Sequence, residues 1–140
     1  MPTLGSAIAA SATALNAERT RVEVAVSNIA NADSTRGPNG QPYRRRDVVL
    51  EAAEQSPFAT ALGEAVGVKV ASVVEDRTPF QQRYEPSHPD ADQNGFVSLP
   101  NVDSQTEMVD LVGASRGYQA NLAAIGIIRD MLQRALELGR

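Results

Sequence analysis

Hydrophobic residues recur at alternating spacings of three and four along the C-terminal third of the chain. This coiled-coil seam consists of Met108, Leu111, Tyr118, Leu122, Ile125, Leu132 and Leu136, with Ser115 and Arg129 as its polar members. No proline follows Pro100, so the pattern predicts one helix over about 105–138. The segment Ser104–Glu107 is typical of a capping box. Such a helix would be roughly 50 Å long, and we expect it to protrude or to pack against other chains.

A weaker stripe of the same kind runs along the N-terminal segment. Its apolar positions are Leu4, Ile8, Leu15, Val22, Val26 and Ile29, and the alanines between them permit close approach of another backbone. The turn-forming residues from Asn31 to Gly40 end this predicted helix. Two interpretations remain open, namely a helical hairpin that covers a core and a coiled coil within the chain or between copies. The seven-residue period favours the coiled coil.

The middle of the chain holds seven of the eight prolines, so it cannot form a long helix. Residues 43–50, the alternating valines at 66, 68 and 70, and residues 96–99 each read as a short strand. We therefore predict an α+β fold that is mainly α. Residues 1–32 and 103–140 would form one coiled-coil domain, and residues 33–102 would form loops and a small β-rich region. The segment 54–66 carries no pattern that we can interpret.

Composition narrows the possible functions. The 140-residue chain has no Cys and one His, which excludes disulfides, thiolate chemistry and a multi-His metal centre within one chain. Its net charge of −4 argues against nucleic acid as a partner. No segment is apolar and long enough to cross a membrane, and no basic region precedes an apolar run as in a secretory signal. We expect a protein that is not membrane-inserted and has no cleaved signal peptide.

The segment Asp90–Gly95 copies the opening of a calcium-binding EF-hand loop. The twelfth position of that loop, where calcium requires a bidentate Glu, is Asn101. Pro86 and Pro89 also exclude the helix that enters such a loop. We therefore interpret this segment as a turn and predict no metal site.

The remaining candidates for chemistry are weak. His88 has no nucleophile signature near it, so we interpret it as a polar loop side chain. The triplet Arg44–Arg46 could bind phosphate, but Asp47 follows it in an acidic chain, which favours packing or ion pairs. Three glycines of the C-terminal segment would allow close helix packing; they are Gly113, Gly117 and Gly126. We predict neither a cofactor nor an enzymatic activity.

Several segments resemble one family. Residues 27–32 are similar to the N-terminal signature of the axial proteins of the bacterial flagellum, which build its rod and hook. Residues 35–50 and 84–97 resemble the short proximal-rod members, and residues 107–121 resemble the shared C-terminal helix motif. The residues that carry these motifs are Asn28, Asn31, Tyr43, Arg44, Arg45, Arg46, Asp47, Pro89, Asp90, Asp92, Asn94, Gly95 and Asn121.

The resemblance implies a structural subunit of the proximal rod, whose terminal helices pair and self-assemble into the drive shaft that transmits torque from motor to hook. It implies copies of the chain, other rod proteins and the flagellar type III export apparatus as partners, with no cofactor. It also implies a location in the basal body, in a rod that spans the periplasm. The residue pattern alone leaves one alternative open, a cytoplasmic helical adaptor or export chaperone that binds client helices.

Overall fold

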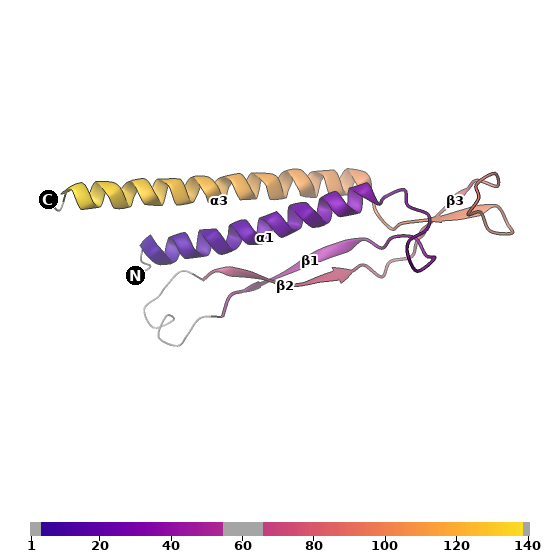
Figure 1. The fold of residues 1–140 in the computed structure, drawn as a ribbon, viewed down its shortest axis with the longest axis horizontal. Coiled ribbons are helices and arrows are strands. Elements are labelled where there is room, and N and C mark those ends of the chain that lie inside the picture. Colours follow the sequence, from indigo (N-terminus) through magenta and orange to yellow (C-terminus); the bar gives the residue numbers. More distant parts are fainter. Residues whose placement is uncertain (1–3, 55–65, 139–140) are drawn as a thin grey trace. The chain divides into compact units, whose positions relative to one another are not determined.

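The computed structural model describes residues 4–54 and 66–138, and two helices dominate it (Figure 1). Helix α1 spans Leu4–Ala30, and helix α3 spans Ser104–Leu138. The predicted mainly helical α+β fold with two long terminal helices that pack together is thus confirmed. The uninterpreted segment lies mostly outside the described residues. No described helix combines the length and apolar character needed to cross a membrane.

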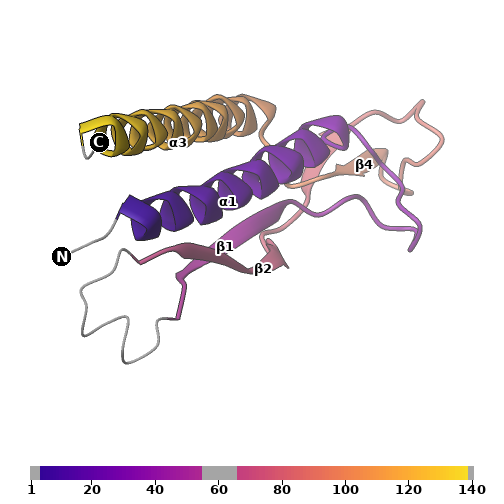
Figure 2. The same cartoon turned by 60° about the vertical axis from the view of Figure 1, so that its left-hand side comes forward.

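The chain is organised as two compact units. One contains residues 1–20, 49–72 and 113–140, and the other contains residues 21–48 and 73–112. Each unit takes a part of α1 and a part of α3, and the two helices lie beside each other in both views (Figures 1 and 2).

Helix α3 begins through an aspartate cap. Asp103 Oδ1 accepts the Gln105 N–H at 3.1 Å, and Asp103 Oδ2 accepts the Thr106 hydroxyl at 2.7 Å. The hydrogen bond from Thr106 and those from the backbone lower the pKa of Asp103. The predicted capping box is wrong because Ser104 is already inside the helix and Glu107, with 2% exposure, points into the protein.

The first sheet pairs β1 (Arg46–Ala52) with β2 (Val68–Glu75). The strand predicted over residues 43–50 therefore starts too early and ends too early. Residues 43–45 lie outside β1, because the Arg45 N–H donates to the Asn101 side chain at 2.8 Å instead of to a neighbouring strand. Strand β2 keeps the predicted alternation only at its start, since Val68 and Val70 are its two half-buried residues.

The second sheet pairs β3 (Gln81–Tyr84) with β4 (Phe96–Leu99) in antiparallel register. The sequence predicted β4 correctly but missed β3. All four side chains of β3 are exposed, so no alternation of apolar and polar residues marks it. Tyr84 and Phe96 face each other in this register, with ring centroids 5.3 Å apart in an edge-to-face contact.

Few large side chains are fully buried in the described residues. The buried apolar residues are Ala17 and Ala114 in one unit, and Ala25, Val97, Leu99 and Val102 in the other. Two polar residues of the second unit are buried as completely, Asn28 with 0% and Glu107 with 2% exposure. Because apolar burial drives folding, a core of such small residues gives the single chain limited stability.

Candidate functional site

Among the described residues, the most deeply buried polar side chain belongs to Asn28 on α1, and all its hydrogen-bonding groups are used. Its Nδ2 donates to the Arg46 carbonyl at 2.8 Å and to Glu107 Oε2 at 2.9 Å. Its Oδ1 accepts the Arg46 N–H and the Tyr43 hydroxyl, both at 3.0 Å. The amide thus pairs with both backbone groups of Arg46, as a neighbouring strand would. We call this cluster of Asn28, Tyr43, Arg45, Arg46 and Glu107 the polar junction.

The buried charge of Glu107 is balanced by Arg45. Arg45 Nε donates to Glu107 Oε1 at 2.6 Å, and its NH1 and NH2 lie 3.3 Å from Asp47 and 3.8 Å from Asp110. Burial of the guanidinium opposes its charge, but the hydrogen bond to Glu107 and the nearby carboxylates outweigh it and raise the pKa of Arg45. The junction therefore joins α1, the segment before β1 and the first turn of α3 through a satisfied ion pair.

Asn101 ties the chain before β1 to the loop after β2. Its Oδ1 accepts the Arg45 N–H at 2.8 Å, and its Nδ2 donates to the Thr78 hydroxyl at 2.8 Å and the Asp76 carbonyl at 3.1 Å. The Thr78 N–H donates to Asp76 Oδ1 at 2.9 Å, and this bond is the main cause that lowers the pKa of Asp76. The two asparagines thus fix the backbone on either side of Arg45.

The aspartate-rich segment after β3 forms a tight turn. Asp92 Oδ1 accepts the N–H groups of Asn94 and Phe96, both at 2.8 Å. Gly95 has a φ of 83°, a left-handed conformation that disfavours any side chain. The Asp92 carboxylate is thereby committed to the backbone of its own turn, as the turn interpretation expected.

Asp90 and His88 hold the start of the same loop. Asp90 accepts the Thr35 hydroxyl at 2.8 Å and pairs with Arg36 at 3.3 Å. His88 Nδ1 accepts the Asp90 N–H at 3.0 Å, so the imidazole ring is part of the hydrogen-bond network of this loop. Pro89, between them, is exposed. Two further motif residues each donate a side-chain hydrogen bond to the carbonyl four residues earlier, Asn31 to Ser27 and Asn121 to Gly117.

The predicted assembly residues divide by exposure. Half-buried are Ile8, Leu15, Val22 and Ile29 on α1, and Leu111, Ile125 and Leu132 on α3. Exposed are Leu4 and Val26 on α1, and Met108, Tyr118, Leu122 and Leu136 on α3. Of the three helix glycines, Gly117 alone is closely approached, because a Cβ there would lie 3.0 Å from Glu18. Within the chain no such approach occurs at Gly113 or Gly126, where a Cβ would meet nothing within 4 Å.

Sequence reasoning missed part of the polar junction. The sequence pattern predicts Glu107 as a capping residue of α3. It gives Asn101, which adjoins the junction by accepting the Arg45 N–H, no role other than the position where a calcium ligand is missing. One available signal was the position of Glu107, which lies three and four residues from Asp110 and Leu111 and so faces the same side of α3. Nothing in the sequence indicates that Asn101 and Asp76 would meet Arg45, because these contacts join distant loops.

Comparisons with known proteins agree with this fold. Residues 8–38 match the family model described as flagella basal body rod protein, and residues 93–138 match that of the flagellar basal body rod FlgEFG protein C-terminal. The chain is 47% identical over 127 residues to the flagellar basal-body rod protein FlgC of Salmonella typhimurium, covering 91% of each chain. It is 43% identical over 142 residues to FlgC of Bacillus subtilis, covering 93% of this chain and 94% of that one. For FlgC of Borreliella burgdorferi the identity is 37% over 147 residues, with 96% and 97% covered.

The helix pair, the small β-rich middle and the two matched segments define the class, a structural subunit of a flagellar rod. The chain belongs to the FlgC family of flagellar basal-body rod proteins. Its function is accordingly that of a structural rod subunit. These matches give no support to the alternative of a cytoplasmic adaptor or chaperone.

Proposed function

We propose that this rod subunit assembles through its terminal helices, with copies of itself and with other rod proteins, into the proximal rod that transmits torque from motor to hook. We further propose that it reaches the basal body through the flagellar type III export apparatus without signal cleavage. The rod then spans the periplasm, and the chain catalyses no reaction.

The observation that carries this proposal is an exposed apolar face on α3. Met108, Val112 and Leu122 are 50%, 45% and 55% exposed, although each is a large apolar side chain. Met108 and Leu122 are fourteen residues apart, two heptads, so they share one face of the helix. Packing such a face against another helix removes apolar surface from water at about 25 cal/mol per Å². In the single chain this face stays in contact with water. The free energy of burying it would be gained when repeated subunits pack together in a rod.

The thin core supports export in an unfolded form. Among the described residues, the buried apolar side chains of the helices are all alanines, which contribute little apolar area. A chain of low stability is unfolded at small cost before it passes a narrow export channel. The subunit would then gain most of its stability on joining the rod.

The test replaces Leu122 in a cell that lacks its own copy of the protein. Leu122→Asp puts a charge on a surface that is exposed in the single chain, so the purified variant should lose less than about 0.5 kcal/mol of unfolding free energy. In the rod the same carboxylate would be buried without a partner, so we expect no hook and no swimming. Leu122→Met keeps the side chain apolar and should swim, and His88→Ala should swim as well.

Two results would contradict the proposal. One is normal swimming and hook formation by Leu122→Asp cells. The other is loss of motility in His88→Ala cells together with normal assembly of Leu122→Asp, since that would point to a site in the β3–β4 loop. Hooks counted in purified basal bodies measure assembly, and the amount of the variant retained in the cell body shows whether poor export is the cause.

A further inference from the structure

Arg44 of the second unit shares one surface hollow with Arg46 and another with Arg77, and none of the three pairs with a carboxylate among the described residues. The Arg44 guanidinium lies 4.3 Å above the ring centroid of Phe80, and that of Arg46 lies 5.6 Å from the centroid of Tyr43. Arg77 is exposed and makes no polar contact with the other described residues. Stacking on an aromatic face holds a guanidinium in place. Arg44 NH1 also donates to the Asp76 and Thr78 carbonyls, both at 3.4 Å, and the other N–H groups of this guanidinium stay available. We call Arg44, Arg46 and Arg77 the arginine groove.

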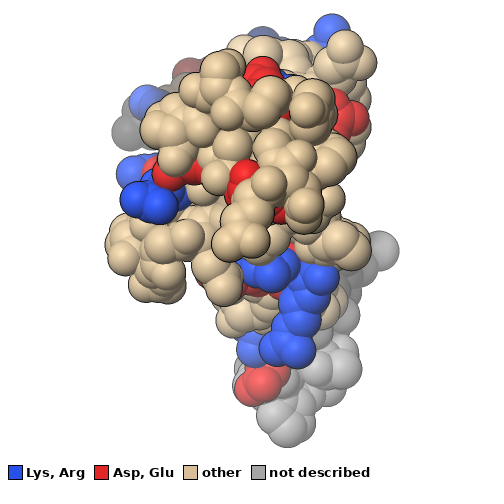
Figure 3. All heavy atoms as spheres, turned by 90° about the vertical axis from the view of Figure 1, so that its right-hand side faces the viewer, with Lys and Arg blue, Asp and Glu red and all other residues tan. Residues whose placement is uncertain are grey.

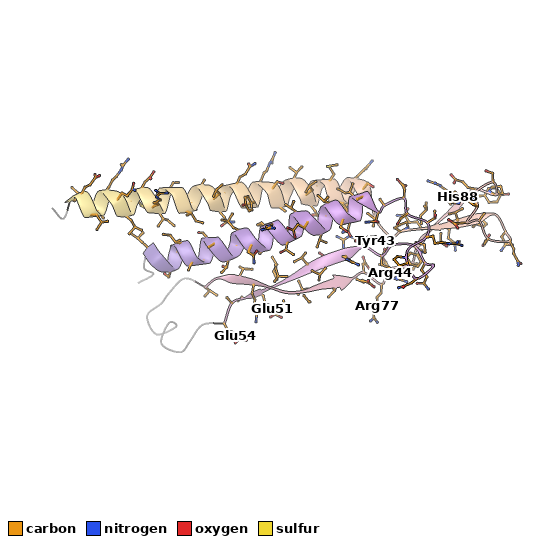
Figure 4. The ribbon with its side chains drawn as sticks, in the orientation of Figure 1. Tyr43, Arg44, Glu51, Glu54, Arg77 and His88 are labelled. Carbon is orange, nitrogen blue, oxygen red and sulfur yellow. The ribbon has the colours of Figure 1, made fainter. Side chains whose placement is uncertain are left out.

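The groove is hollow as well as basic. Arg44 and Arg46 line a hollow of about 340 Å³, and Arg44 and Arg77 line a second one of about 680 Å³. Both hollows share Arg44 and Glu75, so they adjoin, and Glu75 is the acidic residue in both linings. Figure 3 shows Lys and Arg side chains gathered on the face it presents, and Figure 4 labels Arg44 and Arg77. Such a surface fits a ligand that carries more than one carboxylate.

The first unit presents a suitable carboxylate pair at the end of β1. The side chains of Glu51 and Glu54 are 57% and 94% exposed, and both share the ammonium of Lys69, at 3.7 and 3.8 Å. One positive charge for two carboxylates leaves a local negative charge. Of the described carboxylates near the groove, Asp76 accepts the Thr78 N–H and Asp47 pairs with Arg45, whereas Glu75 lines both hollows and offsets part of their positive charge.

We propose that the arginine groove of one copy binds Glu51 and Glu54 of a second copy in the rod, an inference that rests on the proposed assembly function. The groove and the acidic pair are different surfaces of the chain, so the contact is heterologous. A heterologous contact can repeat from copy to copy and generate an open helical assembly. Opposite charges at this contact would also select the register in which copies approach.

The experiment reverses each charge separately and then together in cells that lack their own copy. Arg77→Glu and Glu54→Arg should each reduce the number of hook-bearing basal bodies about tenfold, because like charges then meet at the contact. The doubly swapped chain again places opposite charges at positions 77 and 54, so it should recover assembly. The control Arg83→Gln removes an arginine that pairs with Glu85 at 2.9 Å and lines neither hollow, and it should assemble normally.

Cysteine cross-linking identifies the contact directly, since the chain has no cysteine of its own. Co-expressed Arg77→Cys and Glu54→Cys subunits should form a disulfide-linked pair in oxidised basal bodies, and neither variant alone should do so. Assembly of Arg77→Glu at the normal level, or failure of the double swap to recover, overturns the inference. Both results leave the rod function intact if the subunit still occurs in basal bodies, whereas its absence from wild-type basal bodies would refute the proposed function itself.

Discussion

Truncation of Asn28 to alanine is the perturbation that the polar junction predicts most sharply. Asn28→Ala removes four hydrogen bonds at a fully buried position, two to the backbone of Arg46, one to Tyr43 and one to Glu107. Each neutral bond contributes about 1 kcal/mol, and a bond to a charged partner contributes about 1.5–3 kcal/mol. The four groups left behind include the carboxylate of Glu107, which is 2% exposed.

The expected loss is about 3–5 kcal/mol of unfolding free energy. It is less than the sum of the penalties for four buried groups without partners, because water can enter the space left by the amide. A hollow of about 40 Å³ already adjoins Asn28 and Glu107 and would admit it. A loss of this size is a large fraction of the roughly 5–15 kcal/mol that stabilises an ordinary domain. The variant should therefore be only marginally folded.

Urea unfolding of the purified monomer, followed by far-UV circular dichroism, measures this loss. The matched control is Asn121→Ala, which removes one bond to the Gly117 carbonyl within α3 and gains the helix propensity of alanine, so its stability should change by less than about 0.5 kcal/mol. Asn28→Asp should be as harmful as Asn28→Ala, because it sets a second carboxylate against Glu107. Equal stability of the two alanine variants would refute the buried hydrogen-bond reasoning.

Two smaller predictions concern the loops and caps. The lowered pKa of Asp103 gives stability that is present above its ordinary value of 3.8 and is lost as the pH falls through the folded-state value, so the advantage over Asp103→Asn in urea unfolding should vanish at low pH. An advantage that persists at pH 2 would contradict this. Gly95→Ala should destabilise the chain by about 1–2 kcal/mol, because φ is 83° and the new Cβ would lie 2.9 Å from Tyr84, and unchanged thermal unfolding would contradict that estimate.

The long helices could be predicted from the sequence because their signals are local and repeated. The seam from Met108 to Leu136 and the absence of proline after Pro100 set α3 to within one residue of its observed start. Strand β4 was found for the same reason, since its apolar residues alternate. Strand β3 was invisible, because Gln81–Tyr84 is polar and exposed on both faces and owes its existence to pairing with β4.

The burial pattern of the helices was harder to predict. The heptad stripe marks large apolar residues, yet the fully buried positions on α3 are Glu107 and Ala114, next to the stripe. The resemblance drew attention to Asn28 and Arg45 without giving them roles. Their roles depend on contacts between residues far apart in sequence, such as the 79-residue separation of Asn28 and Glu107, and no local pattern records such contacts.

The measurement that tests the central claim most directly is the reactivity of a cysteine placed at Leu122, the 55% exposed residue on the apolar face of α3. The chain contains no other cysteine, so a maleimide reagent reports on this site alone. We predict rapid labelling of Leu122→Cys in the purified monomer and strong protection of the same residue in purified basal bodies. Equally rapid labelling in both would contradict the claim that this helix face is buried when the rod assembles.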